Sequence, residues 1–171
     1  MSRRDQAARL FQDTDADNNG FITCKELQAT LKNDDGTQYS EQSCKMMIKM
    51  YDRDGDGTIN LEEFKQLFCY LKDWRQAFHH FDADNSGSIE RRELRQVLAQ
   101  LKFNFEEKTI RNCMKKFDVS NTDSLTADEF IRLCTVVHSL SSEFVNRDPE
   151  GAGSITLTQD EFLNMVFRSL I

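Results

Sequence analysis

Three segments of the chain align with one another without gaps, and this repeat constrains the fold more than any other feature. They read DADNNGFITCKE from Asp15, DRDGDGTINLEE from Asp52 and DADNSGSIERRE from Asp82. Each segment has aspartate first, glycine sixth, isoleucine eighth and glutamate twelfth. Because the repeat includes a glycine and an apolar residue as well as acidic residues, it is more specific than an acidic surface turn. It therefore predicts a repeated structural unit.

The oxygen-bearing residues of each segment are spaced as the ligands of a calcium-binding EF-hand loop. Ca²⁺ takes about six to eight oxygen ligands, and such a loop supplies them from positions 1, 3, 5, 7, 9 and 12. Position 7 contributes its backbone carbonyl, position 12 a bidentate glutamate, and glycine at position 6 makes the sharp turn. The expected ligands are Asp15, Asp17, Asn19, Phe21, Thr23 and Glu26 in the first loop; Asp52, Asp54, Asp56, Thr58, Asn60 and Glu63 in the second; and Asp82, Asp84, Ser86, Ser88, Glu90 and Glu93 in the third.

A fourth segment, DVSNTDSLTADE, keeps the first and last positions of the repeat in Asp118 and Glu129. Ser120 and Thr122 replace charged ligands, and Asp123 stands where glycine is expected. Aspartate tolerates a positive φ better than most residues with a Cβ, so the turn can still form. We expect a unit that keeps the fold for pairing and binds calcium weakly or not at all.

A fifth segment, residues 148–161, departs further from the repeat. Ala152 at position 5 has no side-chain oxygen, and position 12 is Gln159, with a glutamate two residues later at Glu161. Two residues rotate a side chain by about 200° around a helix, so Glu161 reaches an ion site only if the loop is reshaped. The apolar residue that follows each closing glutamate is here Phe162, which indicates a two-residue insertion. We expect this loop to be empty of calcium.

The spacing between the loops predicts how the units are connected. The long intervals 27–51 and 94–117 include turn-forming or extended stretches, so each should hold two helices. The short intervals 64–81 and 130–147 contain no such breaker, and apolar residues recur along one face of the first. We expect each short interval to be one continuous helix that two units share.

The resulting prediction is an all-α fold of five helix-loop-helix units with about eight helices. We expect one domain over residues 8–171, preceded by a short N-terminal segment, residues 1–7. At 171 residues the chain is long enough to bury a substantial core in such a domain.

Composition narrows the classes of function. The formal net charge is −7, which does not favour nucleic-acid binding. There is no apolar stretch typical of a signal peptide or a membrane span, and the five cysteines show no metal-site spacing, which favours a cytoplasmic protein with free thiols. No nucleophile motif is present, so we expect neither an enzyme nor a small-molecule substrate.

The five units with alternating spacing resemble the penta-EF-hand family. The resemblance covers residues 8–171 and rests also on the inserted fifth loop and on the stretch EQSCKMMIKMYDRDGDGTINLEEFKQLFCYLKDWRQAFHHFDADNSGSI. It implies a cytoplasmic calcium sensor that dimerises through its fifth unit. It also implies calcium-dependent association with membranes and protein targets.

The dimer expectation has a physical reason. EF-hand loops pair through short strands, so five units leave one strand edge without a partner, and an identical unit on a second chain can cover it. The expected contacts are the edge at Ser154, Ile155 and Thr156 together with Phe162, Met165, Val166 and Phe167.

Three functions stay open from the sequence: a homodimeric calcium sensor, a calcium buffer, and the regulatory subunit of a larger enzyme. We expect about two to three Ca²⁺ ions per chain. The sensor is favoured because the degenerate fourth and fifth loops add scaffold without adding buffering capacity. We also expect that the helix over 64–81 couples the second loop to the third.

Overall fold

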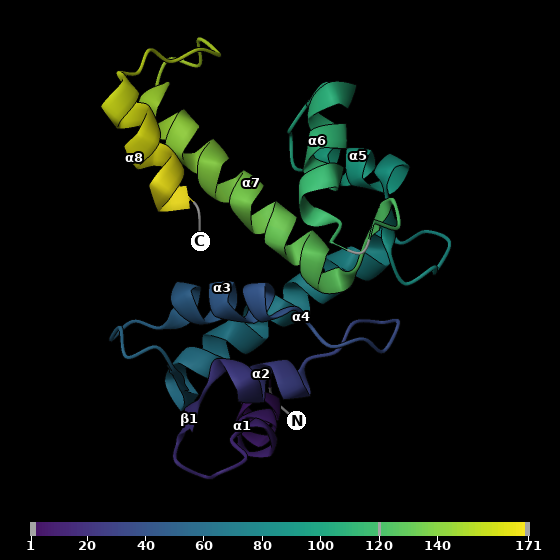
Figure 1. The fold of residues 1–171 in the computed structure, drawn as a ribbon, viewed down its shortest axis with the longest axis vertical. Coiled ribbons are helices and arrows are strands. Elements are labelled where there is room, and N and C mark those ends of the chain that lie inside the picture. The colour runs from purple at the N-terminus through teal and green to yellow at the C-terminus, as the bar shows by residue number, and fades with distance from the viewer. Residues whose placement is uncertain (1–2, 120, 170–171) are drawn as a thin grey trace.

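The computed structural model of the chain describes residues 3–119 and 121–169, and its regular secondary structure is almost entirely helical (Figure 1). The helices are α1 (Arg3–Thr14), α2 (Cys24–Thr30), α3 (Glu41–Tyr51), α4 (Leu61–Phe81), α5 (Arg91–Gln100), α6 (Glu107–Phe117), α7 (Ala127–Arg147) and α8 (Gln159–Ser169). Four two-residue strands lie in the loops: β1 (Phe21–Ile22), β2 (Ile59–Asn60), β3 (Ile89–Glu90) and β4 (Ser124–Leu125). The predicted all-α fold with eight helices is confirmed for the described residues. None of these helices is both long and apolar enough to cross a membrane.

The helix that leaves each of the first four loops starts at the same place relative to its loop, because the loop ends in a helix-capping sequence. Thr23 caps α2, and the side chain of Glu26, the third residue of that helix, accepts a hydrogen bond from the Thr23 N–H. This reciprocal capping box satisfies backbone donors that a helix start otherwise leaves free. The same box is formed by Asn60 with Glu63, by Glu90 with Glu93 and by Thr126 with Glu129.

The short strands join the loops in pairs. β1 pairs with β2 so that Ile22 faces Ile59, and β3 pairs with β4 so that Ile89 faces Leu125. All four side chains are fully buried, which explains why the repeat needs an apolar residue at its eighth position. No strand is assigned to residues 154–156. The first four units therefore pair within the chain, and the fifth has no partner among the described residues.

Two long helices are each shared by two units, as the short intervals predicted. α4 carries Glu63 of the second loop in its first turn and ends at Phe81, directly before Asp82, the first residue of the third loop. Its 21 residues correspond to about 31 Å. α7, also 21 residues long, connects the fourth loop to the fifth in the same way.

The fifth unit lies outside the common core. α7 runs from the middle of the molecule to one corner, and α8 turns back along it, so that the fifth loop lies far from α1–α4 (Figure 1). Nearly all of the buried apolar residues form one cluster, which among the described residues extends from Phe11 to Val137. α8 contributes no residue to this cluster, although the first four units all do. The fifth unit is thus attached to the core mainly through α7.

A buried carboxylate holds the two halves of the core together. Asp128, at the start of α7, is 2% exposed and accepts hydrogen bonds from the Ser40 N–H, the Ser43 hydroxyl and the Asn33 amide at 2.9–3.0 Å. Its own N–H donates to the side-chain amide oxygen (Oδ1) of Asn33 at 3.0 Å. Burial by itself disfavours the charged form, but the hydrogen bonds, led by that from the Ser40 N–H, outweigh it and lower the pKa of Asp128. The connection between α2 and α3 is thereby fixed to the fourth unit.

We expect Asp128→Ala to lower the free energy of unfolding by about 3 kcal/mol, because it leaves several buried donors without an acceptor. Asp128→Asn should lower it less, since one acceptor oxygen remains. Urea unfolding followed by circular dichroism measures both. Asp73→Ala is the control: Asp73 forms an exposed ion pair with Arg3 and should contribute little. Equal effects of the Asp128 and Asp73 alanine variants would contradict this role.

Candidate metal centres

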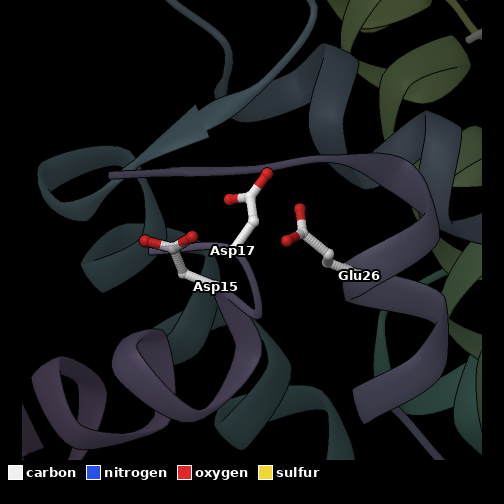
Figure 2. Close-up of side chains that lie close together, drawn as sticks. All are labelled: Asp15, Asp17 and Glu26. Atoms are coloured by element: carbon white, nitrogen blue, oxygen red, sulfur yellow. The ribbon is translucent and has the colours of Figure 1, made fainter. Parts of the chain in front are cut away.

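Three clusters of carboxylates lie where the sequence predicted calcium sites. In each cluster, ligand oxygens from three acidic residues lie within 4.8 Å of one another. Figure 2 shows the first, in which Asp15 and Asp17 come from the loop and Glu26 enters from the start of α2. The second cluster consists of Asp52, Asp54 and Glu63, and the third of Asp82, Asp84 and Glu93. Within the described residues, these three are the clusters of acidic, histidine or cysteine side chains close enough to share a metal ion.

The first aspartate of each loop organises the turn around it. Asp15 accepts hydrogen bonds from the N–H groups of Asn19 and Gly20 at 3.1 and 2.9 Å. These N–H groups converge because Gly20 adopts φ +86°, a conformation that residues with a Cβ rarely take. Asp52 and Asp82 bond the corresponding N–H groups around Gly57 and Gly87 in the same way.

The last glutamate closes each loop by linking its two ends. Glu26 accepts from the Ala16 N–H at 3.1 Å through one oxygen and from the Thr23 N–H at 2.9 Å through the other. The N–H and hydroxyl of Thr23 lower the pKa of Glu26. Glu63 links Arg53 to Asn60 and Glu93 links Ala83 to Glu90 with N···O distances of 2.9–3.0 Å. Each glutamate is therefore oriented toward the aspartates of its loop by backbone N–H groups, with the Thr23 hydroxyl adding a further hydrogen bond to Glu26.

The second loop shows most directly how closely these charges are placed. The Asp56 N–H donates to Asp54 and by itself lowers the pKa of that carboxyl. Desolvation and the negative charges of Asp56 and Glu63 outweigh this bond, so the pKa of Asp54 is raised. A divalent cation at this position would relieve the repulsion.

The clusters lack the side-chain cations that usually accompany grouped carboxylates. The chain contains 22 lysines and arginines, yet none of the ion pairs found within the described residues involves a predicted carboxylate ligand of the first three loops. An all-oxygen donor set with several carboxylates suits a hard cation such as Ca²⁺. The residues of the first three loops therefore fit the ion that the sequence predicted.

The remaining predicted ligands lie in the same loops but are partly engaged with their neighbours. Asn19 donates to Asp17, and the Thr58 hydroxyl donates to Asp56 at 2.7 Å. The Ser86 hydroxyl donates to the carbonyl of Ser88, the expected position-7 ligand. At position 9, Thr23 and Asn60 use their side chains to cap the exit helices, and Glu90 is exposed at the start of α5. Phe21, the position-7 residue of the first loop, lies in β1.

The fourth loop keeps the backbone arrangement but offers fewer charges. Asp118 accepts from the N–H groups of Thr122 and Asp123, and Glu129 accepts from the Val119 N–H at 2.8 Å. Asp123 adopts φ +58°, which confirms that an aspartate takes the place of the turn glycine. Its carboxylate pairs with Arg91 of the third unit, a partner that the sequence analysis did not identify. Ser120 lies outside the described residues.

The fifth loop has two regular ends and an irregular middle. Asp148 accepts from the N–H groups of Ala152 and Gly153 at 2.7 Å, as the first residue of the other loops does. Glu161 is the third residue of α8 and accepts from the Thr158 N–H at 2.8 Å, so Glu161 takes the closing position and Gln159 begins the helix. The two-residue insertion therefore lies between the turn and the helix start.

Pro149 removes one of the bonds that close a regular loop. In each of the first four loops, the closing glutamate accepts a hydrogen bond from the N–H of the second residue. Proline has no N–H, so Glu161 cannot be held in this way. The relevant signal was present in the sequence as a proline at position 2, although the bond itself is apparent only in the structure.

We expect Glu26→Gln, Glu63→Gln and Glu93→Gln each to weaken calcium binding at one site by at least about tenfold, equivalent to about 1.4 kcal/mol, because each removes the charge and the bidentate ligand of that site. Glu129→Gln should leave the number of tightly bound ions unchanged. Isothermal titration calorimetry with calcium measures both quantities. A loss of one tight site in Glu129→Gln, or none in the other three, would contradict the assignment.

Comparison with known proteins supports the same interpretation. The family described as an EF-hand domain pair matches residues 4–69 and 71–135. Sorcin from Schistosoma japonicum is 36% identical over 162 residues, which cover 95% of this chain and 94% of that protein. Peflin from Danio rerio is 31% identical over 167 residues, which cover 97% of this chain.

A solved structure shares the whole fold. It is a homologue of programmed cell death 6 protein from Leishmania major Friedlin, with a TM-score of 0.87 and 28% sequence identity, covering 99% of this chain and 97% of that one. The relatives differ in length, since the chain spans 62% of the Danio rerio peflin. The similarity thus extends over all five units of this chain.

Proposed function

Because this chain belongs to the penta-EF-hand family of calcium-binding proteins, we propose that it is a calcium sensor that binds Ca²⁺ through its first three loops and responds by binding proteins or membrane surfaces. The observation that carries the proposal is the convergence of three carboxylates in each of these loops without a side-chain cation among them. The fourth and fifth loops keep their shape while offering fewer ligands. That division favours a sensor over a buffer.

The change in net charge on calcium binding is one reason to expect membrane association. Each bound ion contributes two positive charges, so three ions change the formal charge from −7 to −7 + 6 = −1. A nearly neutral surface repels anionic membranes less than a strongly acidic one does. We include a cytoplasmic location and calcium-dependent membrane association in the proposal.

The shared helix supplies a route between sites. Glu63 in the first turn of α4 belongs to the second loop, and Asp82 at its end belongs to the third. The same helix packs against α7, where Trp74 and Phe78 each contact the ring of Phe130 at a centroid distance of 5.8 Å. A rotation of α4 at either loop therefore changes the packing on the fourth unit. We propose that this movement exposes apolar surface.

Glu93→Gln tests this coupling. We expect calcium to raise the fluorescence of an apolar dye in the wild-type chain, and the variant to lose most of that increase, because Glu93 connects the third loop to its exit helix. Glu129→Gln serves as the matched control and should keep the increase. A full increase in Glu93→Gln would contradict the coupling, and no increase in the wild-type chain would favour a calcium buffer.

The fifth unit is proposed to form a homodimer. Phe162 and Phe167 on α8 are 51% and 65% exposed, whereas Met165 and Val166 are partly buried. The segment that includes Ser154, Ile155 and Thr156 lies largely at the surface and has no strand partner among the described residues. Exposed aromatic side chains beside an open backbone edge are typical of a protein interface. A second copy of the chain would cover both.

We expect the Phe162→Asp/Phe167→Asp double variant to be monomeric at concentrations where the wild-type chain is dimeric, because it places charges in the proposed interface without disturbing the core. Sedimentation velocity measures this. Leu101→Asp, which changes an exposed apolar residue elsewhere, should remain dimeric. A dimeric double variant would contradict the proposal. A wild-type chain that stays monomeric until another EF-hand protein is added would favour the regulatory subunit of a larger assembly.

A further inference from the structure

We infer that a groove between α3, the end of α6 and α7 binds protein segments that combine acidic and apolar side chains. The groove, called here the α3–α7 groove, has a volume of about 700 Å³. α3 contacts α7, and the end of α6 leads into the fourth loop beside them (Figure 1). This inference adds to the proposed function a binding surface and the chemical character of the partner. Any calcium dependence of this binding rests on the proposed function.

The floor of the α3–α7 groove is apolar. It is formed by Met46 of α3, Phe117 at the end of α6, Val119 of the fourth loop and Val136 of α7. Val119, the second residue of the fourth loop, is 62% exposed. The loop uses only the backbone of Val119: its N–H donates to Glu129 and its carbonyl accepts from the Asn121 side-chain amide, so the loop fold does not require an apolar side chain here. The equivalent residues of the first three loops are Ala16, Arg53 and Ala83.

The rim of the groove is basic. Lys45, Lys49, Lys116 and Arg132 surround the floor. Lys45 pairs with Glu41 at 2.7 Å, but the other three are absent from the ion pairs found within the described residues. The chain as a whole is acidic, with 29 acidic and 22 basic residues, so the basic rim contrasts with its overall charge. A partner with carboxylates would therefore meet a locally favourable charge.

Arg132 is held in place by neutral groups. It donates to the Gln42 side-chain oxygen at 2.7 Å and to the Phe117 carbonyl at 3.3 Å, and its guanidinium lies 5.3 Å from the centre of the Phe117 ring. These contacts fix its position without neutralising its charge. Because the side chain is already ordered, binding a carboxylate there costs less conformational entropy than ordering a free arginine would.

The shape of the groove favours a peptide segment over a lipid surface. Met46, which forms part of the floor, is only 2% exposed, so a flat bilayer surface that rests on the basic rim would have little contact with it. An extended or helical segment can place an apolar side chain on the floor and carboxylates against the rim. A basic amphipathic helix, which many acidic calcium-binding proteins accept, would be repelled here.

The experiment selects peptides from a random displayed library on the full chain with calcium, and then measures the Kd of the selected peptides by fluorescence anisotropy. We expect enrichment of sequences with aspartate or glutamate beside leucine, valine or phenylalanine. Lys49→Glu/Lys116→Glu and Val119→Asp should each weaken binding by at least about tenfold, through the rim and the floor respectively. Lys72→Glu/Lys108→Glu, with the same charge change away from the groove, should bind as the wild type does. Circular dichroism checks that each variant is folded.

Several outcomes would overturn the inference. One is that the selected peptides contain no acidic residues, and another is that they bind the groove variants as tightly as the wild type. A third is that no peptide is selected, while the chain binds anionic phosphatidylserine vesicles and loses that binding in Lys49→Glu/Lys116→Glu. Loss of self-association in that variant would instead assign the groove to a second copy. Peptides that bind equally well in calcium and in chelator would count against the sensor proposal while leaving the groove assignment intact.

Discussion

The link that a closing glutamate makes between the two ends of its loop is the interaction on which the rest of this structure depends. One carboxylate accepts hydrogen bonds from the N–H of the second loop residue and from the N–H of the residue that caps the exit helix. It therefore fixes the loop shape and the helix start, and it also points its own negative charge into the loop. Glu63 and Glu93 do this in neighbouring units that share α4, which places two candidate sites at the ends of one rigid helix. The side chains proposed to bind calcium are therefore the same ones that fix the starts of the exit helices.

The odd number of units explains the different character of the last one. Strand pairing buries Ile22 against Ile59 and Ile89 against Leu125, and this uses all four of the first units. The common core then ends at Val137 among the described residues, leaving α8 with exposed aromatic side chains. In addition, Pro149 deprives the fifth loop of one closing bond. The fifth unit therefore differs from the other four in both its loop and its packing, which is why we propose it as the site of self-association.

Much of the candidate site could be predicted because its residues are close in sequence. The glycine turns, the ligand positions and the positive φ of Asp123 follow from the local geometry of a twelve-residue loop. Asp128 could not be recognised in this way, since it follows the pattern of an ordinary exposed acidic residue near a helix start. Its partners Asn33 and Ser43 are 95 and 85 positions away, and only packing brings them together. The pair of Arg91 with Asp123 and the basic rim of the α3–α7 groove also depend on such long-range packing.

The sequence by itself determined the number of units, which three loops have oxygen-bearing residues at every expected ligand position, and that α4 and α7 are continuous. It could do so because each of these properties depends on contacts within one loop or one helix, where spacing along the chain sets spacing in space. The tertiary structure decided how the halves are joined, which apolar faces stay exposed, and where basic side chains gather around an apolar floor. Those properties arise from residues far apart in the chain, and their proximity is set by how the helices pack and not by the order of the residues.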